Sequence, residues 1–159
     1  MNVPSLSYFV YRTPVGSVSI ASDGSSITHV LLGEHTLPGT QKACEITNRA
    51  AQELQEYFAG KRFSFDLPLN PKGSDFQKQV WAALQNIPYG ETRSYADVAK
   101  AIGNPQAQRA VGSANNKNPI HILIPCHRVI TSDGKLGGYA AGVTTKQFLL
   151  DLERNAQKA

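Results

Sequence analysis

The sequence predicts a mixed α/β (α+β) fold in two parts, a small sheet domain followed by a mainly helical domain. Segments that alternate in polarity and are separated by turn residues fill the first 33 positions, as in antiparallel strands. Apolar residues then recur at helical spacing in several later segments. Turn residues crowd the loop PLNPKGSD (68–75), so we place the boundary there and expect domains at residues 1–70 and 71–159.

The amino-terminal domain is predicted to begin with three strands. SYFVYR (7–12), SVSIAS (17–22) and SSITHVLLG (25–33) are joined by a Pro-Gly turn and by Asp23-Gly24. Residues 46–60 then place apolar side chains at helical spacing, and Gly60 supplies a left-handed stop. KRFSFDL (61–67) alternates again, which predicts a fourth strand.

The carboxy-terminal domain is predicted to begin with a helix that Ser74 caps. Its apolar face consists of Phe76, Val80, Leu84 and Ile87, with Trp81 packed beside them. The turn IPYG (87–90) ends this helix.

Residues 94–116 predict a helix-turn-helix. Ser94 can cap a helix that runs to Ile102 and stops at Gly103, and a second helix can start at Asn104 with Pro105 in its first position. This is a DNA-binding arrangement, although helical hairpins of purely structural purpose share it.

The second of these helices is rich in small residues, and Arg109 is its only long charged side chain. Gly112 costs about 1 kcal/mol relative to alanine in a helix interior, which indicates that the backbone must approach another surface closely. That surface is either a nucleic-acid groove or the rest of the protein.

Positive charge is concentrated in the second part of the chain. Residues 1–70 carry five Lys and Arg against six Asp and Glu, whereas residues 71–159 carry eleven against six. Such asymmetry favours a polyanionic partner such as nucleic acid, although scattered surface lysines give similar sums.

The two cysteines are far apart, so neither a disulfide framework nor a four-ligand zinc site is predicted. His29 and His35 match no zinc spacing with Cys44, and we expect no metal and no cofactor. No apolar run reaches the ~18 residues of a membrane span, and the amino terminus lacks the features of a signal peptide. A cytoplasmic protein is therefore expected.

The stretch NPIHILIPCHRVI (118–130) places Cys126, His127 and Arg128 directly after an aliphatic run and Pro125. A thiol has a pKa of ~8.5, and a basic partner or a nearby guanidinium would favour the reactive anion. Because Pro125 interrupts the strand, a turned backbone could bring the imidazole to the thiol. Cys126 is accordingly a candidate nucleophile, and the alternative is a small buried core residue.

The last helix offers a carboxylate that could orient His127. Its apolar residues cover an arc of roughly 200° that includes Glu153; they are Phe148, Leu149, Leu150 and Leu152. A carboxylate on the buried side needs a partner, which His127 could provide. Alternatively, Glu153 lies at the edge of the arc and reaches solvent or Arg154.

The glycine-rich loop SDGKLGGYAAG (132–142) lacks the strand-then-helix context of a phosphate-binding loop. We interpret it as a wall beside Cys126, where Tyr139 presents a ring face to a planar substrate.

These residues together resemble the O6-alkylguanine-DNA alkyltransferases, also called methylated-DNA-protein-cysteine methyltransferases. The resemblance covers residues 74–154 and is carried by IPCHRV, Asn118-Pro119, RAVGSA with Arg109, SYADVA with Tyr95, the GGY loop and LLDLE. Residues 1–70 are similar to the family's more variable amino-terminal domain, which implies a ribonuclease-H-like sheet.

The resemblance implies direct-reversal DNA repair in a single turnover, with irreversible alkyl transfer from O6-alkylguanine, and from O4-alkylthymine, to Cys126. His127 would activate Cys126 through water, Glu153 would orient His127, and Asn118 would brace the turn. Tyr95 would hydrogen-bond the guanine ring nitrogen and supply a proton.

The resemblance also implies how a monomer would bind double-stranded DNA through the minor groove. The helix with Gly112 would lie in the groove, and Arg109 would fill the gap left by the flipped nucleotide. Asn104 and Ser132 match positions that touch the DNA strand.

The resemblance further implies that backbone groups bind the flipped base. Carbonyls of Cys126 and Val129 would accept from its exocyclic amine, and the amide of Ala140, next to Tyr139, would donate to its oxygen. Asn115 replaces a bulkier apolar residue of vertebrate relatives.

Two other functions share some of these features. A non-catalytic alkyltransferase-like protein would bind the lesion without transfer, but such relatives have tryptophan in place of the acceptor, where this chain has Cys126. A thiol hydrolase would require an oxyanion hole and turnover through an acyl intermediate.

Overall fold

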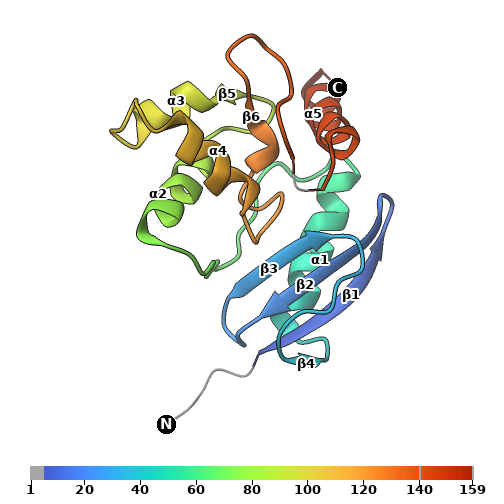
Figure 1. Cartoon of the computed structure of the whole chain (residues 1–159). Helices are drawn as coiled ribbons and strands as arrows, with labels where there is room; N and C mark the ends of the chain where they lie inside the picture. Colours follow the sequence, from blue (N-terminus) through green and yellow to red (C-terminus); the bar gives the residue numbers. More distant parts are fainter. Residues whose placement is uncertain (1–5, 140, 159) are drawn as a thin grey trace. The chain divides into compact units, whose positions relative to one another are not determined.

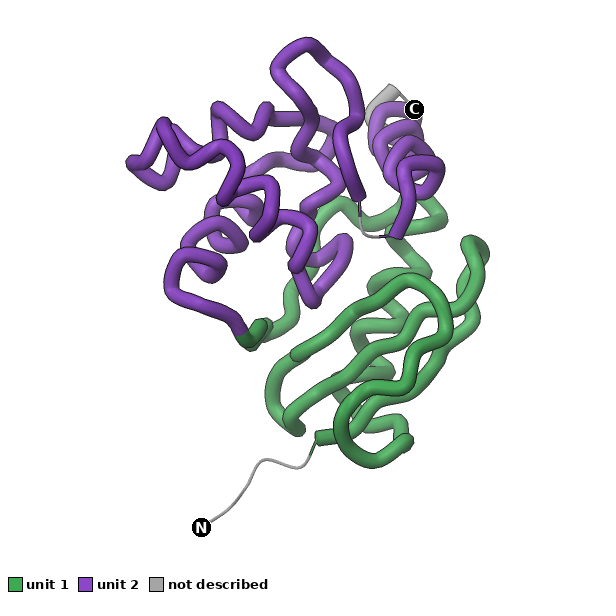
Figure 2. Tube along the Cα trace, viewed as in Figure 1, with its two compact units in different colours: residues 1–72 green, residues 73–159 purple. Residues whose placement is uncertain are grey.

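The computed structural model describes residues 6–139 and 141–158. The chain divides into two compact units, residues 1–72 and 73–159, which Figure 2 shows in separate colours. Each unit is described by itself below.

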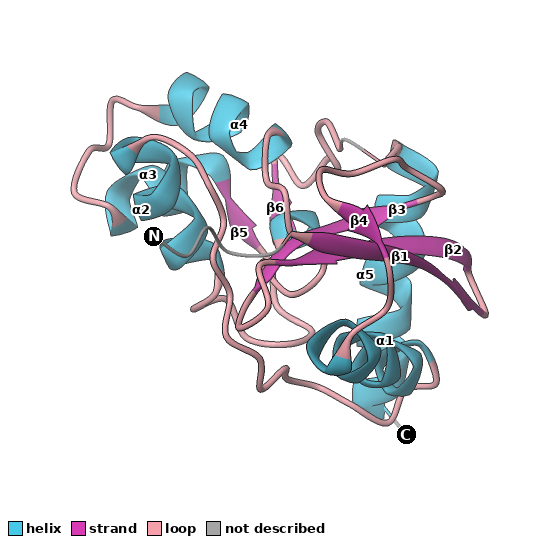
Figure 3. Ribbon diagram, turned by 90° about the horizontal axis from the view of Figure 1, so that it is seen from below, coloured by secondary structure: helices cyan, strands magenta, loops and turns pink. Residues whose placement is uncertain are grey.

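The first unit is a sheet covered by one helix (Figures 1 and 3). Strands β1 (Ser7–Thr13), β2 (Gly16–Ser22), β3 (Ile27–Leu32) and β4 (Thr40–Gln41) lie in the order β3-β2-β1-β4, with β4 parallel to β1 and the other pairs antiparallel. Helix α1 (Glu45–Phe58) contacts β1, β2 and β3. Its Ala50, Leu54 and Tyr57 are fully buried, which confirms the predicted strands and helix of this unit.

The fourth strand predicted at residues 61–67 is wrong. Leu69 instead makes the isolated bridge to Ile27 at the edge of β3. The Asp66 amide donates to the side chain of Glu53, whereas in a sheet it would donate to the backbone carbonyl of a neighbouring strand. Phe63 is 51% exposed, whereas the ring centre of Phe65 lies 5.6 Å from that of Tyr57, so the alternating apolar residues do not share one fully buried face.

In the second unit three helices pack on one another, and the first of them contacts the turn that carries Cys126. These helices are α2 (Asp75–Leu84), α3 (Tyr95–Ala101) and α4 (Gln108–Asn116). Short strand β5 (Arg93–Ser94) pairs in parallel with β6 (Val129–Ile130), and a 3₁₀ turn, η1 (Cys126–Arg128), directly precedes β6. Helix α5 (Val143–Lys158) follows and contacts η1. The β5–β6 pairing therefore fixes the start of α3 beside the cysteine turn.

The cap at Ser74 and the core position of Trp81 are confirmed. The Ser74 hydroxyl oxygen accepts a hydrogen bond from the Gln77 amide at 3.1 Å, and the Ser74 amide donates to the side-chain oxygen of Gln77 at 2.9 Å. Trp81 is 2% exposed, and its Nε1 donates to the Ala114 carbonyl at 2.9 Å, which ties α2 to α4. Ile87 is buried, but α2 ends before it, at Leu84.

The helix-turn-helix starts as predicted but its second helix begins later. Ser94 caps α3, and Gly103 has φ +78°, the left-handed conformation expected of the stop. Residues 104–107 form a turn, closed by the Ala107 amide donating to the Asn104 carbonyl at 3.0 Å, and α4 starts at Gln108. The predicted start at Asn104 is wrong because these backbone groups close a separate turn.

Among the helices of the described residues, none has the length and apolar character that crossing a membrane requires.

Removing the cap of α2 should lower the stability of the second unit. The substitution Ser74→Ala should reduce the free energy of unfolding by about 1 kcal/mol, because the Gln77 amide loses its acceptor. Ser74→Asp, which keeps an acceptor and adds a negative charge at a helix amino terminus, should retain wild-type stability. Urea unfolding followed by circular dichroism measures both variants, and equal midpoints for them would contradict the prediction.

Candidate active site

Cys126 is held by a tightly hydrogen-bonded turn. The Asn118 side chain donates to the Ile124 carbonyl at 2.7 Å and accepts from the Ile120 amide at 2.9 Å. The Cys126 amide donates to the Ile124 carbonyl at 2.8 Å. Ile122 has φ +71°, a strained conformation for a β-branched residue, which the surrounding bonds maintain. The turn places the Cys126 sulfur inside the unit rather than on a regular strand.

The thiol of Cys126 is shielded from solvent. The residue is 1% exposed, and burial raises the pKa of its thiol to about 11. The neighbouring Asn118 and Tyr139 side chains and the charge of Lys146 favour the anion, but they do not outweigh burial. Cys126 is therefore protonated at neutral pH, and a base must take its proton before the sulfur can act as a nucleophile.

His127 follows Cys126 in the same 3₁₀ turn and is paired with Glu153. The two side chains are 0% and 1% exposed, and His127 Nε2 lies 2.6 Å from Glu153 Oε2. Burial lowers the pKa of His127, although Glu153 opposes the shift, so the imidazole is neutral at pH 7. Nε2 then donates to the carboxylate, and Nδ1, which has no hydrogen-bond partner among the described residues, keeps a free lone pair. That nitrogen can accept a proton.

Glu153 is also held by Arg128. Arg128 Nε donates to Glu153 Oε1 at 2.8 Å, Nη2 donates to Oε2 at 3.0 Å, and Nη1 donates to the Ile87 carbonyl at 2.8 Å. The Gly90 amide adds a bond to Oε1 at 3.0 Å. Burial alone would raise the pKa of Glu153, but His127 and Arg128 lower it to about 2. The carboxylate is therefore ionised and fixed.

The structure pairs His127 with Glu153, and Cys126 directly precedes His127 in the same turn, but it corrects the expected position of Arg128. We expected the guanidinium to favour the thiolate directly. It instead forms two bonds to Glu153, and so it acts on the carboxylate that orients the imidazole. Arg128 is buried and lies 5.6 Å from the ring centre of Tyr89.

The buried face of α5 differs from the predicted arc. Phe148 is 45% exposed and Leu152 is only partly buried, so the predicted apolar arc included two positions that the structure does not bury fully. Leu149, Glu153 and, unexpectedly, Lys146 are buried. Lys146 and Glu153 are seven positions apart, so they lie on one face of the helix. This spacing is a signal for Lys146 that the sequence analysis missed.

Lys146 is fully buried and bonded to three backbone carbonyls. Its Nζ donates to the Val129 carbonyl at 2.5 Å, to the Gly138 carbonyl at 3.3 Å and to the Leu136 carbonyl. Burial lowers the pKa of Lys146 to about 8, and the proximity of Cys126 opposes the shift. The ammonium form therefore predominates at pH 7.

Tyr95 and the glycine-rich loop lie close to the sulfur. Burial and then Cys126 raise the pKa of Tyr95, which leaves its hydroxyl protonated. A methyl group added at Gly137 would lie 2.9 Å from the Tyr95 hydroxyl oxygen, and Gly137 has φ +70°, so glycine is required there. Tyr139 is 9% exposed, and its ring centre lies 5.8 Å from that of His121. The ring is therefore buried, whereas we expected it to present an exposed face to the substrate.

Both backbone carbonyls that we expected to accept from the flipped base already accept hydrogen bonds within the protein. The Cys126 carbonyl accepts from the Val129 amide and from Asn115 Nδ2 at 3.4 Å, and the Val129 carbonyl accepts from Lys146. Asn115 is 1% exposed and was not predicted as a site residue. Ala140, the expected amide donor, lies outside the described residues.

The expected DNA-contacting residues are on the surface of the second unit. Arg109 on α4, Asn104 in the turn before it and Ser132 in the loop after β6 are all exposed. At Gly112 an added methyl group would meet only the Tyr95 ring, at an ordinary 3.8 Å. Packing within the described residues therefore does not require glycine at this position.

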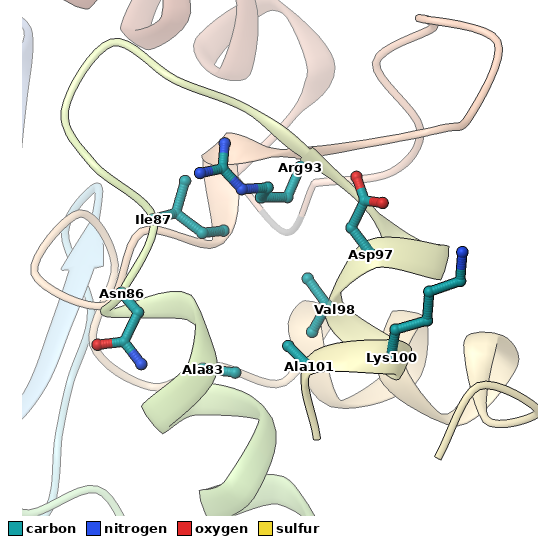
Figure 4. Close-up of a pocket in the computed structure, with 8 residues that line it drawn as sticks. All are labelled: Ala83, Asn86, Ile87, Arg93, Asp97, Val98, Lys100 and Ala101. Carbon is teal, nitrogen blue, oxygen red and sulfur yellow. The ribbon is translucent and has the colours of Figure 1, made fainter. Parts of the chain in front are cut away.

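A separate cavity of about 610 Å³ lies between α2, α3 and the segment that joins them (Figure 4). Ala83, Val98 and Ala101 line its apolar part, and the charged side chains of Arg93, Asp97 and Lys100 surround it. None of the predicted site residues lines this cavity. Within residues 6–139 and 141–158, no group of three or more His, Cys, Asp or Glu could hold a metal ion.

Comparisons with known proteins agree with the motifs. Residues 75–155 match the family described as 6-O-methylguanine DNA methyltransferase, DNA binding domain, and residues 6–71 match its ribonuclease-like domain. The chain is 50% identical over 153 residues to a methylated-DNA-protein-cysteine methyltransferase of Methanosarcina barkeri, which covers 93% of this chain and 97% of the relative. It is 46% identical over 160 residues to the constitutive methyltransferase of that name from Bacillus subtilis, covering 95% and 97%.

The fold is similar to that of a solved relative. The crystal structure of Mycobacterium tuberculosis OGT in complex with DNA has a TM-score of 0.88 and 44% identity, covering 94% of each chain. The resemblance inferred from the sequence and the mixed α/β fold class are both confirmed. These matches cover nearly the whole chain and include the buried Cys126, and so the chain belongs to the 6-O-methylguanine DNA methyltransferase family.

Proposed function

We propose that this protein repairs DNA by direct reversal, transferring the methyl group of O6-methylguanine to Cys126 in a single turnover. The observation that carries the proposal is the buried Cys126 beside a neutral His127 that Glu153 orients, within a chain of this family. In this proposal His127 accepts the proton of the thiol, and the carboxylate of Glu153 stabilises the resulting imidazolium.

The chemical step balances with groups that the site contains. Cys126 gives its proton to His127, directly or through one water, and the sulfur anion attacks the methyl carbon. A sulfur–carbon bond forms as the bond between that carbon and the guanine oxygen breaks, and the electron pair moves into the guanine ring. Tyr95 donates a proton to the ring nitrogen, and the proton held at His127 restores Tyr95. Neutral guanine and S-methylcysteine result.

The proposal includes DNA binding by α4 in the minor groove. A relative of 44% identity was solved in complex with DNA, and in this chain Arg109 is exposed on α4 with small residues around it. Arg109 would fill the space of the flipped nucleotide, and phosphate contacts from Asn104 and Ser132 would offset part of the flipping cost. We propose that the protein acts as a monomer, and free Cys44 and Cys126 fit the reducing cytoplasm.

The two carbonyls expected to meet the guanine amine retain acceptor capacity in this proposal. A carbonyl oxygen has two lone pairs, so the Val129 carbonyl can accept from Lys146 and from the base together. The Cys126 carbonyl already has two donors, and the weaker one, Asn115 at 3.4 Å, would give way. Admission of the base therefore requires a small rearrangement at Asn115.

Replacing the acceptor should separate binding from transfer. Cys126→Ser should receive no methyl group from a duplex with one O6-methylguanine, because a serine hydroxyl ionises far less readily than a thiol, while its affinity for the duplex persists. Mass spectrometry of the protein measures the adduct. Cys44→Ser is the control and should gain one methyl group per molecule; a methyl group on the Cys126→Ser protein, or many turnovers by the wild type, would contradict the proposal.

Removing the charge of Glu153 should slow transfer by about a hundredfold or more, because His127 loses the carboxylate that stabilises its protonated form. Glu153→Gln is the test, with the single-turnover rate at saturating protein as the measurement. Asp151→Asn on the same helix is the matched control and should transfer at the wild-type rate. Circular dichroism checks that the variant is folded, and a folded Glu153→Gln protein with unchanged rate would refute the role of Glu153.

The free protein should hold Cys126 as a thiol at neutral pH. Since burial raises the pKa of this thiol to about 11, the thiolate should appear only as the pH approaches that value. Ultraviolet difference titration of Cys44→Ser against the Cys44→Ser, Cys126→Ser double variant isolates Cys126 from the tyrosines. A thiolate signal between pH 6 and 8, on the order of one per molecule, would contradict the expected direction of the shift.

A further inference from the structure

Lys146 is a buried charge that the proposed chemical step does not use. It is 0% exposed, although lysine is rarely fully buried without a partner. Burial of an ammonium group costs several kcal/mol unless hydrogen bonds replace the lost water. Three backbone carbonyls accept hydrogen bonds from Lys146 in place of water, and these bonds allow a lysine to occupy this buried position.

The three carbonyls belong to two separate walls of the site. Val129 follows the cysteine turn directly and lies in β6, whereas Leu136 and Gly138 belong to the glycine-rich loop. The loop is otherwise closed on itself by the bond between the Thr131 amide and the Lys135 carbonyl at 2.9 Å. One ammonium group therefore joins the carbonyl side of the proposed base pocket to the loop on its other side.

The loop positions a group that takes part in the proposed transfer. Gly137 lies between two of the residues that Lys146 holds, and its Cα hydrogens face the Tyr95 hydroxyl so closely that a methyl group would fall 2.9 Å from the oxygen. A shift of this loop would change the space beside Tyr95. The Lys146 charge also acts on Cys126, where it favours the anion.

We infer that Lys146 is a positioning residue for alkyl transfer, holding the Val129 carbonyl and the Leu136–Gly138 loop as the two walls that receive the flipped base. This inference rests on the proposed function. Lys146 bonds no substrate atom itself, because Val129, Leu136 and Gly138 already take its three donors. It acts through the backbone that it holds.

The test compares Lys146→Met with Lys146→Arg. Methionine keeps the apolar stem but removes the donors, so the single-turnover rate of methyl transfer at saturating protein should fall by about ten- to a hundredfold as the walls separate. Affinity for an unmodified duplex should stay unchanged, since it depends on the exposed residues of α4. Lys146→Arg, which keeps charge and donors, should recover most of the rate, and hydrogen exchange of amides 131–139 should be faster in Lys146→Met only.

Gln147→Met is the matched control, because Gln147 is the next residue of α5 and its side chain donates to Asp151 of the same helix at 2.8 Å. It should transfer at the wild-type rate. If Lys146→Met does not fold, Lys146→Gln takes its place in the comparison with Lys146→Arg.

Three results would overturn the inference: a wild-type rate in the variant that lacks the charge, a parallel loss of duplex affinity and rate, or no recovery with arginine. Failure of the wild-type protein to transfer a methyl group would instead overturn the proposed function, and so the two failures are distinguishable.

Discussion

The carboxylate of Glu153 is the group on which the rest of the site depends. It is 1% exposed and accepts from His127, from two nitrogens of Arg128 and from the Gly90 amide. An ionised carboxylate can be buried only with such partners. The same bonds that make its burial possible fix the imidazole in one orientation and tie α5 to the cysteine turn and to the segment after α2. Stability and chemistry therefore share one interaction.

This arrangement separates the resting state of the sulfur from its reactive state. Burial keeps Cys126 protonated, and an unactivated thiol is a poor nucleophile and a poor target for oxidation. In the proposed function the neutral His127, which follows Cys126 in the turn, takes the proton when an electrophilic carbon is in place. Under the proposed function the sulfur becomes reactive only when a base takes its proton, which would suit a protein whose acceptor is used once.

The sequence allowed the main elements of this site to be predicted because their signals are local. Ser74 and Ser94 form caps with the residues three positions later, and Glu153 falls within a helical apolar arc. The partners of Arg128 and Lys146 could not be predicted, because basic residues are normally assigned to the surface and the acceptors lie 25 and up to 17 positions away. For the burial of Lys146 the sequence held one signal, its spacing of seven residues from Glu153.

The wrong predictions have the same cause. Residues 61–67 alternate like a strand, but Glu53 and Leu69 take the contacts that a strand there would need. The start of α4 was placed at Asn104 because Pro105 suits a first helical turn, yet residues 104–107 close a turn of their own. In both segments the local sequence was compatible with two structures. A hydrogen bond to the distant Glu53 determined the first, and a bond within the turn itself determined the second.

Helix α5 combines two buried charges of opposite sign on one face. Glu153 is bonded to side chains of the cysteine turn, and Lys146 is bonded to backbone of the strand and loop that follow it. Moving the helix would leave both charges without partners, at a cost of several kcal/mol for each. These bonds therefore hold the surroundings of Cys126 before any base arrives, apart from Asn115, which has to move. Under the proposed function the free energy of DNA binding would then go mainly into flipping the nucleotide rather than into assembling the site.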